Sequence, residues 1–244
     1  TPADPTLYVN AAGWSLGADM PGVFTPLLTY DLGDMTASAV VRKDGIRLEQ
    51  LVLPWAGGRM VAWGNITPER RFEDGHITVE DVSLAPLLQQ FDAAPTPWVD
   101  FKGDGEISVS GTLVPLRLEG PFDFGVADLR VGDRPIGDPN VDLRLDIPTA
   151  HAEGTLVLEK DHVFLSAQTV RGPRSTGSAD IDIGFGPRGP LDLQFDLSQA
   201  DLQDFQPLAN TRLQGTGAIS GRIAGPFNAL TFEGQGDVRD FSVL

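Results

Sequence analysis

The feature that most constrains this chain is a two-residue alternation of apolar and polar positions that runs through most of its 244 residues. In the segment 213–223, for example, Leu213, Ile219 and Ile223 share one phase with three glycines. Such a period is typical of a β-strand with one apolar and one polar face. Turn signals such as Lys-Asp-Gly at 43–45 separate these segments at short intervals. The sequence therefore predicts an all-β fold with roughly a dozen or more strands.

Helical spacing of apolar residues is confined to a few short segments. Residues 82–91 place leucines and a phenylalanine at i, i+3, i+4 and i+7, and residues 200–210 show a similar spacing. A third segment, 20–29, is interrupted by Pro21 and Pro26. We therefore expect one or two short helices beside the strands.

The composition excludes several classes of partner. The chain carries 34 acidic and 18 basic residues, which gives a formal charge of −16. An acidic surface repels phosphate backbones and anionic membrane surfaces, so nucleic acid is not an expected partner. There is no cysteine, which excludes disulfides and thiolate metal sites. No stretch reaches the ~20 apolar residues of a membrane helix, and the first residues lack a signal-peptide pattern, so we expect a mature or excised segment of a longer protein.

The chain also repeats itself. Residues 101–108 match residues 213–220 without a gap, as Phe/Leu-x-Gly-x-Gly-x-Ile-Ser. The order of strand pair, helix and glycine-rich hairpin occurs twice, over 46–131 and 163–243. Self-similarity of this kind is typical of stacked arrays, in which each unit buries its apolar face on the next. We therefore treat residues 1–244 as a single repetitive segment rather than as separate domains.

Few motifs point to catalysis or to metal binding. Gly-Trp-Ser-Leu-Gly at 13–17 matches the G-x-S-x-G pattern of hydrolases, but a proline and a glycine follow where that chemistry needs a helix. The histidines, His76, His151 and His162, have nearby carboxylates but no metal-ligand spacing such as H-E-x-x-H. We expect a protein that is not an enzyme, with no cofactor and no metal site.

A set of segments carries a resemblance to a known family. A leucine-bearing segment, DVSLAPLLQQF at 81–91, precedes GDGEISVSGTL at 103–113 and LRLEGPFDF at 116–124. The same order of features recurs in 200–243, which ends in DFSV. In this combination the chain resembles the AsmA-like/TamB superfamily of bacterial envelope proteins, and TamB-type members in particular. The resemblance covers most of residues 30–244 and rests on glycines and alternation rather than on a polar motif.

The resemblance implies a fold, a location and a function. The family fold is an elongated, strongly bent antiparallel β-sheet that forms a U-shaped, taco-like trough with an apolar concave face. The implied function is that of a segment of a periplasm-spanning conduit, which carries phospholipid acyl chains between the inner and outer membranes of a Gram-negative bacterium. The parent protein is expected to be anchored in the inner membrane. The expected partner is a phospholipid or another acyl-chain lipid, with an outer-membrane β-barrel protein as a further candidate.

The alternation assigns residues to the two faces of such a sheet. Outward positions are mostly acidic, as at Asp104, Glu106 and Asp182, and inward positions are apolar or glycine. Inward glycines would leave width for a ligand or let the sheet bend. The side chains that we expect to line the groove are Ile107, Val109, Leu113, Leu116, Leu118, Phe122, Phe124, Leu156, Leu158, Val163, Leu165, Ile181, Ile183, Leu191, Leu193, Phe195, Ile219, Ile223, Leu230 and Phe232.

Three other interpretations remain open from the residues alone. The same alternation builds a two-sheet sandwich whose core is filled by side chains. Open sheet edges would suit a scaffold for the assembly of outer-membrane β-barrel proteins. An extracellular β-solenoid adhesin or polysaccharide enzyme would use Trp55 and Trp63, which flank a turn, as a stacking platform for a sugar.

Overall fold

The computed structural model describes most of the chain between Leu7 and Val243. The described residues are 7–14, 35–55, 57–83, 98–132, 139–141, 143–184, 190–206, 212–226 and 231–243. Ser15 of the G-x-S-x-G motif, the segment 20–29 and Leu230 lie outside this part of the chain.

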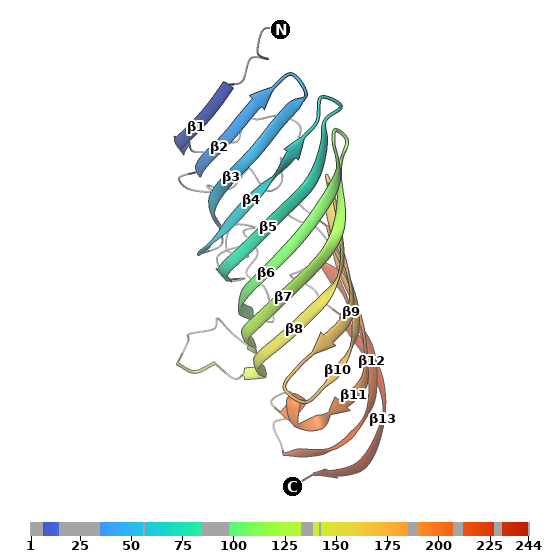
Figure 1. The fold of residues 1–244 in the computed structure, drawn as a ribbon. Coiled ribbons are helices and arrows are strands. Elements are labelled where there is room, and N and C mark those ends of the chain that lie inside the picture. Colours follow the sequence, from blue (N-terminus) through green and yellow to red (C-terminus); the bar gives the residue numbers. More distant parts are fainter. Residues whose placement is uncertain are drawn as a thin grey trace.

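All described strands belong to one antiparallel sheet, which confirms the predicted all-β fold. The 13 strands follow one another in chain order, so each strand pairs only with its sequence neighbours. Figure 1 shows one long sheet that twists and curls between the N-terminal and C-terminal ends. The sheet is open, with β1 and β13 as its two edges. The strands are β1 (Leu7–Trp14), β2 (Met35–Arg42), β3 (Gly45–Trp55), β4 (Gly58–Ile66), β5 (Arg71–Ser83), β6 (Trp98–Leu113), β7 (Leu116–Gly132), β8 (Leu143–Glu159), β9 (His162–Arg171), β10 (Thr176–Gly184), β11 (Pro190–Asp201), β12 (Leu213–Pro226) and β13 (Thr231–Val243).

The helical element that the structure describes is η1, a 3-10 helix at Leu202–Phe205 between β11 and β12. The helix predicted over 200–210 begins later than expected, because β11 runs through Asp201. The segment predicted as a helix over 82–91 begins as a strand instead, because β5 runs through Ser83. The rest of that segment lies outside the described residues.

The strand connections alternate between two long rims of the sheet, because neighbouring strands run in opposite directions. One rim, which we call the turn rim, carries tight turns at 43–44, 114–115 and 160–161. The other, which we call the loop rim, carries η1 and the connection 172–175 between β9 and β10. Because η1 contacts β8 as well as β11 and β12, it joins strands that are not neighbours in the sheet.

Aspartates in the left-handed backbone conformation interrupt several strands. Asp74, Asp81, Asp128 and Asp240 have φ angles of 51°, 52°, 53° and 52°. Asp74 and Asp81 lie at register shifts between β5 and β6, and Asp240 lies beside a shift between β12 and β13. Aspartate tolerates this conformation better than most residues, and the extra residue of a β-bulge bends and twists its strand. The bulges therefore contribute to the curvature of the sheet.

One face of the sheet is apolar, and its most buried part lies in the middle strands. A cluster of buried side chains joins β5 to β9, and half-buried apolar residues pack around it. Its buried members are Phe72, Val109, Leu116, Leu118, Phe122, Leu156 and Ala167. No large side chain among the described residues is less than 2% exposed. A sandwich would bury such side chains completely under a second sheet, so the described strands do not form one.

Candidate functional site

Apolar residues form continuous rows across the apolar face, because each strand pairs in register with the next. One row begins at Val41 in β2, passes Leu118 in β7 and reaches Leu191 in β11. Its members are Val41, Ile46, Ile66, Phe72, Gly111, Leu118, Leu158, Val163, Ile183 and Leu191. Neighbouring strands lie about 4.8 Å apart, so this row is on the order of 40 Å long when measured along the sheet. That length exceeds the ~15 Å that one leaflet contributes to the ~30 Å hydrocarbon core of a bilayer.

The structure places the described lining residues on this one face, because residues paired in register share a face. The buried ones are Val109, Leu116, Leu118, Phe122 and Leu156. Those packed half-buried around them are Ile107, Leu113, Phe124, Leu158, Val163 and Leu165. Those that stay partly exposed in the later strands are Ile181, Ile183, Leu191, Leu193, Phe195, Ile219 and Ile223. Phe232 pairs with Ile223 in register, and its side chain lies outside the described part of the structure.

Phenylalanine rings cover glycines on the apolar face. A Cβ added at Gly103 in β6 would lie 2.6 Å from the ring of Phe124 in β7. A Cβ added at Gly221 in β12 would lie 2.6 Å from the ring of Phe195 in β11. Carbon atoms that close overlap, so each ring fills the space that a larger side chain would need. The inward glycines therefore make room for neighbouring rings. The rings fill the space beside Gly103 and Gly221, so these glycines do not leave hollows in the apolar face.

The opposite face is polar and carries many acidic residues. Asp182 and Asp192 are paired across β10 and β11, which places like charges side by side. Arg222 of β12 holds Asp192 through two hydrogen bonds of 2.8 and 2.6 Å. The hydrogen bond from Arg222 lowers the pKa of Asp192 below its ordinary value. Arg222 therefore compensates part of the negative charge where the acids crowd together.

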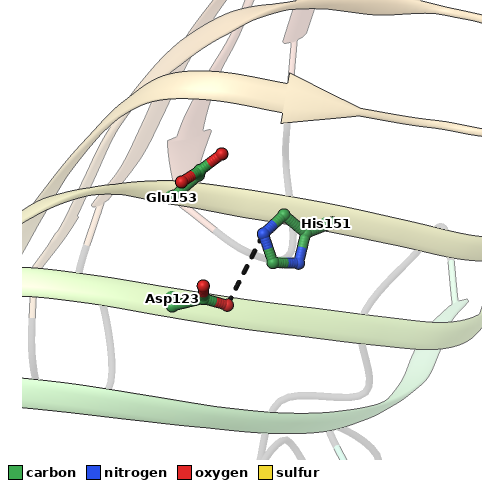
Figure 2. A group of neighbouring side chains, drawn as sticks. All are labelled: Asp123, His151 and Glu153. Carbon is green, nitrogen blue, oxygen red and sulfur yellow. Dashed lines mark ion pairs between the residues drawn. The ribbon is translucent and has the colours of Figure 1, made fainter.

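A carboxylate–histidine group lies on the polar face of β7 and β8 (Figure 2). The Nε2 atom of His151 is 3.5 Å from Oδ1 of Asp123, and Glu153 lies opposite Asp123 in register. One ligand atom from each of the three lies within 4.8 Å of the others. Arg171 pairs with Glu153 at 3.3 Å and supplies positive charge to the group. Because Asp123 is exposed and Arg171 already pairs with Glu153, this arrangement is explained without a bound ion.

Trp63 lies on the polar face, where it stacks on His76 with the ring centroids 5.4 Å apart. The Nδ1 atom of His76 is in turn 3.1 Å from Oγ of Ser108. The side chain of Trp55 lies outside the described part of the structure, so the stacking platform predicted from Trp55 and Trp63 stays a prediction.

A buried polar network fastens η1 to the loop rim. Asp204, which is 7% exposed, accepts hydrogen bonds from Oγ of Ser175 at 2.7 Å and from the backbone N–H of Arg174 at 3.1 Å. Oγ of Ser175 accepts from the backbone N–H of Asp201 at 3.1 Å. Asp201 caps η1 by accepting from the backbone N–H of Gln203. No spacing pattern in the sequence points to these residues, because the contacts depend on how distant strands pair.

Within the part of the chain that the structure describes, no helix combines the length and apolarity needed to cross a membrane.

Comparisons with protein-family models, with curated proteins and with solved structures find no match for this chain. The function must therefore be inferred from the residues and their geometry.

Proposed function

We propose that this chain is a segment of a periplasmic conduit that carries the acyl chains of phospholipids along its apolar face between the inner and outer membranes. The observation that best supports the proposal is the row of paired residues from Val41 to Leu191, on a face that no second sheet covers among the described strands. Phe72 and Leu118 in the middle of the row are buried, whereas Ile183 and Leu191 at its end stay partly exposed. An apolar surface that stays accessible commonly marks a binding site. An acyl chain is an apolar ligand that can lie along such a row of side chains.

Movement along such a face needs no catalytic group. An acyl chain that lies on apolar side chains leaves water, which is worth about 0.8 kcal/mol for each buried CH₂. Because these contacts are non-directional, a chain that slides from one row to the next exchanges similar contacts. Partly exposed residues such as Ile183 and Leu193 can make contact without first being uncovered. The direction of flow would follow a lipid gradient or an external motor.

The polar face suits an aqueous compartment next to membranes. Its acidic residues favour water and repel anionic membrane surfaces, so lipid is directed to the other face. The proposed location, the periplasm of a Gram-negative bacterium with the parent protein anchored in the inner membrane, follows from the family resemblance. The proposed ligand is a phospholipid, and no nucleic acid or cofactor takes part.

Two neighbouring substitutions test the proposal. Leu193 lies half-buried on the apolar face, whereas Gln194 is exposed on the polar face of the same strand. Leu193→Asp and Gln194→Asp add the same charge to opposite faces. In native mass spectra of the chain expressed in a Gram-negative periplasm, we expect phospholipid on the wild type and on Gln194→Asp. Leu193→Asp should reduce the lipid by about tenfold or more, because an unpaired charge in contact with an acyl chain is costly.

The position of the substitution matters for this test. Val109 is 3% exposed in the central cluster, so a charge there would unfold the sheet as well as repel lipid. Circular dichroism should show that Leu193→Asp and Gln194→Asp are both folded. A folded wild-type chain that binds no lipid after incubation with phospholipid vesicles would contradict the proposal, as would equal lipid on the two variants.

The two outermost strands of the described sheet favour a second function. Among the described strands, β1 and β13 each pair with one neighbour, and an outermost strand can offer backbone donors and acceptors to an added strand. Large side chains on these edges are exposed, with Tyr8 at 72% and Phe241 at 60%. As an alternative, the chain would serve as a scaffold on which outer-membrane β-barrel proteins assemble. Photo-crosslinks from position 241 to such a protein would support this function, and crosslinks to lipid alone would remove it.

A further inference from the structure

The loop rim holds a cavity of about 280 Å³ beside η1. It is formed by the start of β8, the connection between β9 and β10, and η1. Its lining residues are Asp146, Ile147, Pro148, Pro173, Arg174, Gln203 and Asp204. A cavity of this size falls just below the usual range for drug-sized ligands, so it suits a small polar group.

One wall of the cavity is held in place and carries the ion pair between Arg174 and the buried Asp204. The buried carboxylate of Asp204 accepts a hydrogen bond from the backbone N–H of Arg174, which fixes that residue against η1. The guanidinium of Arg174 is 54% exposed, and its Nη1 atom is 3.6 Å from Oδ1 of Asp204. A guanidinium has several N–H donors, so the others can bind a phosphate at the mouth of the cavity.

The facing wall is negative. The side chain of Asp146 is 48% exposed, and its Oδ1 atom is 3.7 Å from Nε of Arg130. Arg130 also pairs with Asp128 at 3.4 Å, so the two carboxylates share one cation. Part of the charge of Asp146 is therefore left uncompensated. The amide of Gln203 adds a group that can donate and accept hydrogen bonds.

We propose that this cavity binds the zwitterionic headgroup of an ethanolamine phospholipid whose acyl chains lie on the apolar face, an inference that rests on the proposed function. The phosphate accepts hydrogen bonds from Arg174 and Gln203, and the ammonium donates to Asp146. Ile147 and the two prolines pack against the carbons between these charges. The headgroup stays at the rim, in contact with water, because burying its charges on the apolar face would be costly.

The charges of the cavity discriminate between headgroups. The anionic headgroup of a glycerol phospholipid brings no cation to Asp146, so that carboxylate repels it. A choline headgroup has a positive charge but no N–H donor for Asp146. An ethanolamine headgroup supplies both the positive charge and the donors.

Competition between two lipids measures this preference. The chain is incubated with vesicles that contain equal amounts of ethanolamine and glycerol phospholipids with the same acyl chains, and bound lipid is identified by native mass spectrometry. We expect about tenfold more ethanolamine lipid on the wild type, which corresponds to one hydrogen bond between charged groups. Asp146→Asn should bring the two lipids to about equal loading. Arg174→Gln should lower the loading of both lipids, because both carry a phosphate.

Asp161→Asn is the matched control for Asp146→Asn. It removes the same charge from a side chain that is 81% exposed in the turn between β8 and β9, on the opposite rim. This variant should keep the wild-type preference. Equal loading by the wild type, or a preference that survives Asp146→Asn, overturns the headgroup site and leaves the proposed function standing. A wild-type chain that binds neither lipid overturns both.

Discussion

The central strands β5–β9 and the C-terminal strands β10–β13 share one alternation but bury it to different extents. In the centre, Leu118 and Phe122 are 4% and 8% exposed. In the C-terminal strands, Ile183 and Leu193 stay partly exposed. The two longest strands, β7 and β8 with 17 residues each, lie in the centre.

This difference separates two consequences of the same pattern. The alternation decides on which face a residue lies, whereas the size of the side chain and of its neighbours decides how deeply it is buried. In the centre, large inward side chains pack against one another and are buried. In the C-terminal strands, the inward side chains stay partly exposed, so the apolar face is more accessible there. We infer that the centre supplies most of the stability and that the C-terminal strands supply most of the accessible apolar surface.

The largest effect is expected in the centre. Leu118→Ala removes a buried side chain and should lower the free energy of unfolding by about 2–5 kcal/mol. Leu193→Ala removes a partly exposed side chain, and its cost should stay below about 1.5 kcal/mol. Denaturant unfolding followed by circular dichroism measures both costs. Equal costs would remove the distinction between the two regions.

The next effect concerns η1, which contacts β8 of the centre and β12 of the C-terminal strands. Asp204→Ala leaves Oγ–H of Ser175 and the N–H of Arg174 without their acceptor, which should cost about 1–3 kcal/mol. Hydrogen exchange should become faster at Arg174 and Asp201 and stay slow at Leu118. Faster exchange at all three would show that η1 supports the whole sheet rather than the junction of the two regions.

A smaller effect tests the rings that cover glycines. Gly103→Ala forces the ring of Phe124 away from β6 and should cost about 1 kcal/mol or more. Gly125→Ala is the control, because the nearest atom to its added Cβ is the main-chain oxygen of Asp104 at 3.7 Å. Its effect should stay within about 0.5 kcal/mol. Thermal unfolding compares the two variants, and equal shifts would show that the ring does not set the packing of this face.

The smallest effect is a pH dependence in the C-terminal strands. The hydrogen bond from Arg222 lowers the pKa of Asp192 from its ordinary value of 3.8. The folded chain therefore favours the charged carboxylate, and the resulting stability is present above that ordinary value and lost as the pH falls through the lowered one. The effect is small because the side chains of Asp192 and Arg222 are 33% and 55% exposed.

Thermal unfolding of the wild type and of Asp192→Asn between about pH 5 and about pH 2 measures this dependence. The wild type should be the more stable at the higher pH, and the difference should vanish in acid. A difference that does not change with pH would mean that the ion pair contributes nothing to the stability of these strands.

The sequence was sufficient to predict the sheet and its two faces, because the pleat of a strand reproduces the period of the alternation directly. It was not sufficient to predict the bulges. Leu197 and Ala200 flank a register shift in β11, which separates two neighbouring inward positions by three residues. The helix prediction over 200–210 rested on the spacing of Leu202, Phe205 and Leu208, and it began too early because β11 extends through Asp201.

The loop-rim site could not be predicted for a different reason. Ser175 and Asp204 are 29 residues apart in sequence, and their hydrogen bond forms because two hairpins bring them together. The lining of the apolar face depends on local alternation, whereas this network depends on the register of β9 to β12. A single aspartate in a short helical segment gives no signal of such a contact.

The most direct test of the central claim asks which face of the sheet touches an acyl chain. Ile183 and Asp182 are neighbours in β10 and lie on the apolar and polar faces, respectively. A photoreactive amino acid is placed at each position in turn, and the chain is irradiated in a Gram-negative periplasm. If the apolar face carries lipid, we expect phospholipid adducts at position 183 and only background labelling at position 182. Equal adducts at the two positions, or none at either in a folded chain, would contradict it.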